Sequence, residues 1–184
     1  MPTHVMLDLE TMGTGSYAAI IAIGAVKFDP HAYTVGAEGA ETFYMPVTLE
    51  SSMKAGLRVD AGTIEWWMKP ARTAARERWL AEDKVQLDEA LLAFIEWFGA
   101  DDTMPVWGNG AAFNNVVLSN AYLALGIDKP WGYKADRCFR TFKSAILPAV
   151  SAPVYGTAHH ALDDAIIQAL WLQKIVNDRS IRVG

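Results

Sequence analysis

The feature that most constrains this chain is a pair of carboxylates near its start, in the stretch HVMLDLET at positions 4–11. Three apolar residues precede Asp8, which is typical of a buried β-strand. Residues two apart in a strand point to the same face, so Asp8 and Glu10 project side by side, about 7 Å apart at their Cα atoms. Two ionised carboxylates this close repel each other unless a cation lies between them, and hard ions such as Mg²⁺ or Mn²⁺ bind carboxylate oxygens. The same pattern also fits a strand that ends in a polar turn.

The length and composition are those of one domain, which we assign to residues 1–184. The chain has 184 residues, of which 52% are hydrophobic, and this is enough to build a sizeable core. The longest apolar run, at positions 18–26, is too short to span a membrane and is expected to be a buried strand. The first residues lack the basic region and cleavage site of a signal peptide, so we expect no membrane insertion.

Charge and cysteine content narrow the classes of function. The formal net charge is −5, whereas proteins that bind nucleic acid over a long electrostatic footprint are usually basic. An acidic protein can still process nucleic acid if it holds only a chain end and lets metal ions meet the phosphates. The single cysteine, Cys138, excludes an intramolecular disulfide and fits a reducing cytoplasm. We expect Cys138 to be a small core residue rather than a nucleophile.

Hydrophobic periodicity and turn residues predict strands in the first part of the chain and alternating helices and strands in the rest. Beyond the first strand, strands are expected over residues 19–28, 41–47 and 104–107. Helices are expected over residues 60–81 with a break at Pro70, and over residues 86–99, 112–125, 137–147 and 161–178. This order predicts an α/β fold in which a mixed sheet is flanked by helices and an opening β-meander carries the two carboxylates.

Two later stretches place polar side chains at the start of a helix. The first, at positions 107–115, contains a strand, a glycine turn and a helix start, which puts Asn114 at the rim of the sheet. The second contains His159 just before the last helix and Asp164 in its first turns. A histidine there can move toward a substrate while an anchored carboxylate holds a metal. Each stretch alone also fits a solvated helix N-terminus, and no Cys or further His supports a zinc site.

Taken in order, these stretches resemble the DEDDh family of 3′–5′ exonucleases, which includes polymerase proofreading subunits, oligoribonuclease, ribonuclease T and phage exonucleases. The matching motifs are Asp8-Leu9-Glu10-Thr11, Gly110-Ala111-Ala112-Phe113-Asn114 and His159-x-Ala161-x-x-Asp164. The second and third motifs are most similar to those of the small phage and bacterial exonucleases. The resemblance covers nearly the whole chain and implies a ribonuclease-H-like fold with a mixed five-stranded sheet and a metal site on one face.

The resemblance also implies hydrolysis of a phosphodiester with two Mg²⁺ or Mn²⁺ ions about 4 Å apart. Asp8 would bridge both ions, Glu10 and Asp164 would complete the site of the attacking water, and His159 would be the general base. The family has Asp where this chain has Asn114. Asparagine keeps the shape and an acceptor oxygen but loses the charge, so this departure bears on activity and not on the fold.

Four residues are candidates for contacts with the substrate. Thr11 and Met12 follow the first motif directly, and Phe113 belongs to the second motif, so we expect these three to contact the terminal nucleotide. The adjacent Trp66 and Trp67 leave a helix roughly 100° apart, so one can be core while the other borders a cleft. We assign base stacking to Trp66, although an aromatic side chain at helical spacing more often belongs to the core.

The leading function is therefore a metal-dependent 3′–5′ exonuclease that releases mononucleotides from single-stranded or short DNA or RNA and is weakened by Asn114. One alternative is a catalytically feeble relative that binds nucleic acid or a partner protein, and another is a phosphodiesterase for short or cyclic oligonucleotides. The asparagine is either natural or an engineered change that traps substrate. We expect a cytoplasmic protein of a bacterial cell or a phage-infected host, without a membrane partner, and leave a homodimer open.

Overall fold

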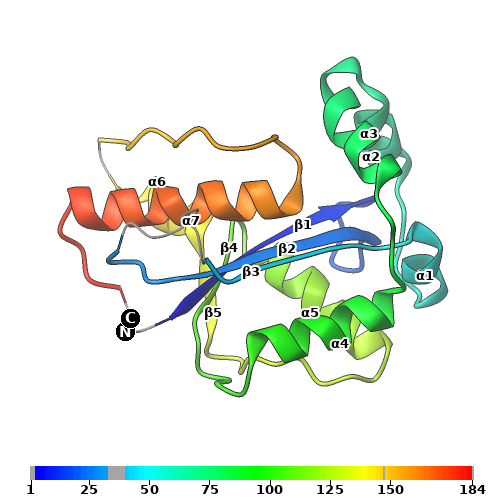
Figure 1. Ribbon diagram of the computed structural model, residues 1–184, viewed down its shortest axis with the longest axis horizontal. Helices are drawn as coiled ribbons and strands as arrows, with labels where there is room; N and C mark the ends of the chain where they lie inside the picture. Colours follow the sequence, from blue (N-terminus) through cyan, green and yellow to red (C-terminus); the bar gives the residue numbers. More distant parts are fainter. Residues whose placement is uncertain (1–2, 33–39, 147, 184) are drawn as a thin grey trace.

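A mixed sheet forms the centre of the molecule (Figure 1). The computed structural model describes residues 3–32, 40–146 and 148–183. The strands are β1 (His4–Thr11), β2 (Ile20–Phe28), β3 (Thr42–Pro46), β4 (Val106–Gly108) and β5 (Asp136–Cys138). They lie in the order β3-β2-β1-β4-β5. β2 runs antiparallel to both β1 and β3, whereas β4 runs parallel to β1 and to β5. β1 is therefore central, and the carboxyl ends of β1, β4 and β5 meet at one edge.

Helices cover both faces of the sheet. They are α1 (Leu49–Lys54), α2 (Ala61–Met68), a 3-10 turn (Pro70–Arg72), α3 (Thr73–Ala81), α4 (Leu87–Phe98), α5 (Asn114–Ala124), α6 (Phe139–Ser144) and α7 (Ala161–Asp178). In Figure 1, α6 and α7 lie on one side of the sheet, α4 and α5 lie on the other, and α2 and α3 form a pair that projects beyond one end. Within the described ranges, no helix is both long enough and apolar enough to cross a membrane.

The alternation of side chains along β1 decides where its carboxylates point. Val5, Leu7 and Leu9 belong to the core that packs against α4 and α5, whereas Met6 belongs to the core that packs against α7. Asp8 and Glu10 follow Met6 in steps of two residues, so they share its face of the sheet. The sequence of β1 therefore directs both carboxylates toward α7.

The start of α7 lies directly on β2, and a glycine makes this approach possible. Gly24 pairs with Asp8 across the β1–β2 ladder. A Cβ atom at position 24 would overlap the backbone carbonyl carbon of Ala161 and the backbone nitrogen of Leu162. Only glycine leaves room for the helix at this distance. This contact brings the first turn of α7 next to the carboxylates of β1.

The predicted fold class is confirmed, and so are most of the predicted elements. The last helix has the predicted bounds, and Pro70 separates α2 from α3 as its missing N–H requires. Asp60 caps α2, because its Oδ1 accepts a hydrogen bond of 2.7 Å from the backbone N–H of Thr63. The predicted helix at 112–125 begins two residues later than expected, at Asn114.

The prediction of a helix over residues 137–147 is wrong at its beginning. Residues 136–138 form β5, and the helix α6 covers only Phe139–Ser144. Leu147, where this helix was expected to end, lies outside the described residues. A three-residue strand has little local signal, because its backbone is fixed by pairing with β4. Cys138 ends this strand and is partly exposed, so the expectation of a core residue is also wrong. The helix α1 was not predicted.

Candidate active site

Three carboxylates gather where β1 meets the first turn of α7. Asp8 and Glu10 come from β1, and Asp164 comes from α7. One oxygen of each carboxylate lies within 4.8 Å of an oxygen of the other two. Three carboxylates at such spacing suit a hard divalent cation, which prefers oxygen ligands. The sequence could not show this distance, because Asp164 stands at the other end of the chain.

The burial of this cluster makes its negative charge costly. Burial and the neighbouring charge of Asp164 raise the pKa of Asp8 from 3.8 to about 7. Burial and the charges of Asp8 and Asp164 likewise raise the pKa of Glu10, and burial raises the pKa of Asp164 to about 6. A divalent cation among these oxygens would offset both the desolvation and the repulsion. The donor set and its electrostatics therefore fit Mg²⁺ or Mn²⁺.

Two side-chain amides hold the Asp8 carboxylate in place. Asn114 donates from Nδ2 to Oδ1 of Asp8 over 3.0 Å, and Gln168 donates from Nε2 to the same oxygen over 3.2 Å. Both hydrogen bonds lower the pKa of Asp8, although less than burial raises it. Gln168 was missed by the sequence analysis. It stands four residues after Asp164, one helical turn away on the same face of α7, and this spacing is the signal that could have revealed it.

His159 lies beside the cluster in an unusual backbone conformation. Its φ is 63°, in the left-handed region that non-glycine residues rarely adopt. Its backbone N–H donates to Oδ2 of Asp164 over 3.1 Å, and its ring packs edge-on against Trp66 with the ring centroids 5.0 Å apart. Burial, followed by the charge of Arg72, lowers the pKa of His159. The imidazole is thus neutral at physiological pH and able to accept a proton.

His160, the next residue, has a different environment. It is buried, and its Nδ1 accepts a hydrogen bond of 3.4 Å from the backbone N–H of Asp163, which makes it the N-cap of α7. Its ring packs against Tyr44 with the centroids 4.3 Å apart. Asp163 points away from the carboxylate cluster and binds Nη1 of Arg78 over 2.9 Å. The adjacent histidines and aspartates of this motif are therefore divided between the cluster and the helix cap.

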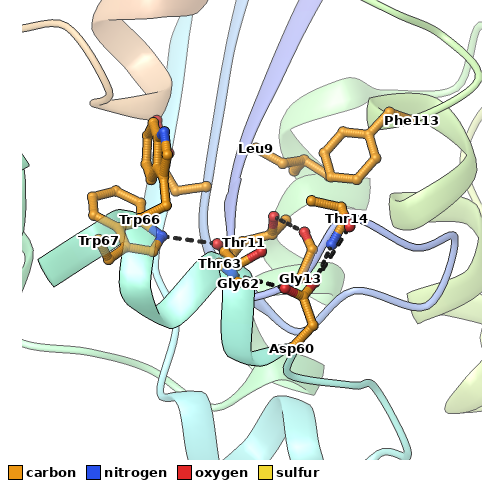
Figure 2. Close-up of a pocket in the computed structure, with 11 residues that line it drawn as sticks. Leu9, Thr11, Gly13, Thr14, Asp60, Gly62, Thr63, Trp66, Trp67 and Phe113 are labelled. Atoms are coloured by element: carbon orange, nitrogen blue, oxygen red, sulfur yellow. Dashed lines mark hydrogen bonds between the residues drawn. The ribbon is translucent and has the colours of Figure 1, made fainter. Parts of the chain in front are cut away.

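A pocket of about 470 Å³ opens beside Glu10. Figure 2 shows the rings of Trp66 and Trp67 on one side of it and Phe113 on the other. Trp67 is fixed by a 3.0 Å hydrogen bond from its Nε1 to the carbonyl oxygen of Thr11. Trp66 is half-buried, and the guanidinium of Arg72 stacks on its ring 4.2 Å from the centroid. Two aromatic walls that line one pocket suit a flat, partly apolar group such as a nucleobase.

The structure brings only some of the residues predicted to contact the substrate into this pocket. Thr11, Trp66 and Phe113 line the pocket. Met12 was expected to join them, but it is not among the lining residues and packs against the apolar core instead. The register shift between Glu10 and Thr11 breaks the alternation of β1 just before Met12. Besides Glu10 and Thr11, the polar part of the lining includes Thr14, Asp60 and Thr63, which the sequence did not indicate as site residues.

Residues 3–176 match the model of a protein family described as the 3′–5′ exoribonuclease Rv2179c-like domain. The chain belongs to this family. This Rv2179c-like domain is also 27% identical over 124 residues to the exodeoxyribonuclease of Enterobacteria phage T4. That match covers 61% of the present chain and 52% of the phage protein, so it spans about half of the relative's length.

Solved structures share the fold of this Rv2179c-like domain. The nuclease domain of 3′hExo, a DEDDh family member bound to rAMP, has a TM-score of 0.61 at 13% identity, covering 100% of this chain and 96% of that one. The E. coli ExoI–ssDNA complex has a TM-score of 0.58 at 16% identity, covering 97% of this chain and 40% of that one. The predicted resemblance to the DEDDh exonucleases and the ribonuclease-H-like fold are therefore confirmed.

Proposed function

We propose that this protein is a metal-dependent 3′–5′ exonuclease that removes mononucleotides from the 3′ ends of DNA or RNA. The observation that carries the proposal is the cluster of Asp8, Glu10 and Asp164, because three partly buried carboxylates within 4.8 Å of one another have the charge and the ligand type for divalent ions. Membership of an exoribonuclease domain family supports the reaction. The aromatic pocket beside Glu10 supports the terminal nucleotide as the group that is held.

The cluster would hold two Mg²⁺ or Mn²⁺ ions, with Asp8 shared and Glu10 and Asp164 completing the first site. Such ions supply a nucleophilic hydroxide at neutral pH and neutralise the charge of the scissile phosphate. The amides of Asn114 and Gln168 both donate to Oδ1 of Asp8. Among the described residues, none donates to Oδ2 of Asp8, so this oxygen would be available to a cation.

The chain's own residues supply the proton transfer and the grip on the substrate. His159 accepts the proton of the attacking water, because its lowered pKa keeps an imidazole nitrogen unprotonated. Trp66 and Phe113 hold the terminal base between aromatic rings. Asp60 and Thr63 also line this pocket. We propose that this pocket takes the terminal nucleotide, as exonuclease activity requires.

Asn114 favours a second candidate, a catalytically feeble relative that binds nucleic acid ends. With an amide in place of the family's carboxylate, the cluster has three negative charges where the family has four. The ion next to Asn114 is then held by Asp8 and by the substrate phosphate, so it binds weakly until substrate arrives. We propose that this sequence binds 3′ ends firmly and cleaves them slowly. A phosphodiesterase for short oligonucleotides would use the same cluster and a shorter pocket.

The test is a cleavage assay with 5′-labelled single-stranded DNA, single-stranded RNA and dinucleotides in Mn²⁺. The family description names a ribonuclease and the T4 relative is a deoxyribonuclease, so both sugars belong in the assay. We expect a ladder of products shortened from the 3′ end, blocked by a 3′ phosphate and absent from Asp8→Asn. Cleavage of circular strands, or identical ladders from the Asp8→Asn variant, would refute the proposal. Cleavage of dinucleotides alone would support the phosphodiesterase.

A further inference from the structure

His159 has no side-chain anchor of its own. In the described part of the chain its ring makes no hydrogen bond, and it touches Trp66 edge-on. Its backbone is held in the left-handed region by a single hydrogen bond to Asp164. A general base must be held within a fraction of an ångström of its productive place. The segment before His159 and the helix that carries Trp66 therefore have to be fixed by other residues.

Asp163 fixes the segment before His159. Its Oδ2 accepts a hydrogen bond of 2.9 Å from the backbone N–H of Thr157. The preceding Gly156 has a φ of 51°, and a Cβ atom there would lie 2.5 Å from the carboxyl carbon of Asp163. The loop is thus seated directly on the Asp163 carboxylate, two residues before His159. Only a glycine allows the loop to come so close.

Arg78 connects the same carboxylate oxygen to the α2–α3 pair. Its Nη1 lies 2.9 Å from Oδ2 of Asp163, and its Nε lies 3.6 Å from Oε1 of Glu82 on its own helical segment. The Asp163 side chain is only 12% exposed, against 42% for Arg78. A carboxylate so deeply buried needs a charged partner, so this pair is unlike an ordinary surface ion pair.

The two residues of this ion pair hold elements that meet again beside the carboxylate cluster. Arg78 stands on α3, which is paired with the helix α2 that carries Trp66, while Asp163 holds the loop that carries His159. Trp66 and His159 are in contact, with their rings at 88° to each other. One ion pair therefore fixes both partners of the contact that orients the imidazole.

We propose that Arg78 and Asp163 are positioning residues that hold His159 in place for proton transfer by clamping its loop to the α2–α3 pair. This inference rests on the proposed function, in which His159 is the general base. Neither residue belongs to the carboxylate cluster, so their loss should spare metal binding. Their effect should appear in the chemical step and should pass through His159.

The test measures single-turnover cleavage and oligonucleotide binding for Arg78→Gln and Asp163→Asn, in the Asn114→Asp background. We expect the cleavage rate to fall about 10- to 100-fold, in the range found for partners that orient a catalytic group. The Kd for the oligonucleotide should change less than about threefold. Mn²⁺ binding should be unchanged. The double variant should be no slower than the slower single variant. Arg78→Lys, which keeps the charge, should recover most of the rate.

A second arm asks whether the effect passes through His159. In the His159→Ala background, Arg78→Gln should cause no further loss of rate, because the group that it positions is absent. Lys174→Gln is the matched control, since it breaks a 2.6 Å ion pair at the far end of the same helix α7. An additive loss, a raised Kd with an unchanged rate, or an effect no larger than that of Lys174→Gln would overturn the clamp.

Hydrogen exchange separates the failure of this inference from the failure of the proposed function. The amide of Thr157 is protected by Asp163, so peptides that contain it should exchange faster in Arg78→Gln and Asp163→Asn than in Lys174→Gln. If the Asn114→Asp parent has no exonuclease activity, the proposed function is wrong and this exchange decides the clamp alone. If the parent is active, but both variants keep the parental hydrogen exchange and the parental cleavage rate, only the clamp is wrong.

Discussion

Asn114 donates a hydrogen bond of 3.0 Å to Oδ1 of Asp8, so the second motif of the family meets the first through an amide and a carboxylate. The amide also reaches the carbonyl oxygen of Leu7 over 3.4 Å. An aspartate at position 114 could donate neither bond. It would face Asp8 with a like charge, which is tolerable only with a cation between the two. In this chain an amide–carboxylate hydrogen bond satisfies the contact between positions 114 and 8.

Asn114→Asp should raise exonuclease activity. The change restores a fourth carboxylate to the cluster, and we expect at least a 10- to 100-fold gain in turnover, the range typical of groups that support a metal site. Turnover of a short labelled oligonucleotide across a Mn²⁺ titration measures this, and high Mn²⁺ should partly rescue the parent. Asn115→Asp is the control, because Asn115 binds Asp136 and the carbonyl oxygen of Val106 instead. Equal rates for the Asn114→Asp variant and the parent would remove Asn114 from the second-ion position.

His159→Ala should slow the reaction without loosening the metal. Removal of a general base typically costs 10²- to 10⁴-fold in rate, and single-turnover kinetics in the Asn114→Asp background measures the loss. His160→Asn is the comparison, since asparagine preserves the helix cap that His160 provides. The His160 variant should keep its rate within about threefold. The reverse result would mean that the third motif has been aligned one residue too early.

Asp8→Ala should abolish measurable Mn²⁺ binding in isothermal calorimetry. Asp8 is proposed as the ligand shared by both ions, and its loss also leaves the amides of Asn114 and Gln168 without their acceptor. Asp178→Asn removes one carboxylate from the exposed end of α7 and should leave binding intact. If the two variants bind Mn²⁺ equally well, the ion does not lie at the cluster.

The stability of the metal-free protein should fall as pH rises. Asp8 has an ordinary pKa of 3.8 when unfolded and about 7 when folded, and Asp164 about 6 when folded. A raised folded pKa means that the folded state holds its protons more tightly, so its stabilising contribution is complete below about pH 4 and is lost up to about pH 7. Thermal unfolding in EDTA should therefore give a lower Tm at pH 8 than at pH 5. Mn²⁺ should raise the Tm more at pH 8. The pH dependence should shrink in Asp8→Asn.

Gly24→Ala should displace α7 from the sheet. The added methyl group meets the backbone of Ala161 and Leu162, which cannot yield as a side chain can. We expect destabilisation of about 1–3 kcal/mol or more, as for other overpacked sites, together with weaker Mn²⁺ binding because Asp164 moves with the helix. Urea unfolding and calorimetry measure the two effects. Gly15→Ala is the control, because nothing lies within 4 Å of a Cβ atom there.

The sequence predicted the central features because they have local causes. The face shared by Asp8 and Glu10 follows from strand alternation, and α7 follows from its apolar stripe. The strand β5 could not be predicted, since its three residues are extended only because β4 pairs with them. The same limit applies to Gln168 and Arg78, whose partners stand 160 and 85 residues away in the chain.

The expectation for Met12 rests on its motif position alone and stays a prediction. Met12 was expected at the substrate because it follows the first motif. In the structure, Thr11 lines the pocket, whereas Met12 packs against the apolar core. A motif position fixes the backbone of a residue and not the direction of its side chain. Strict alternation from Asp8 and Glu10 would have placed Met12 on their face of the sheet, but the register shift between Glu10 and Thr11 ends that alternation.

The position of Gln168, which reaches Asp8 across 160 residues of chain, has a consequence for the order of folding. The meander that carries the first two carboxylates can pair locally, whereas α7 must close the longest loop of the molecule before it docks. During synthesis from the N-terminus, Asp8 and Glu10 leave the ribosome long before Asp164 exists. The topology therefore withholds the complete metal cluster from any growing chain that does not yet include α7, and the capacity to bind the ions arrives only when that helix docks.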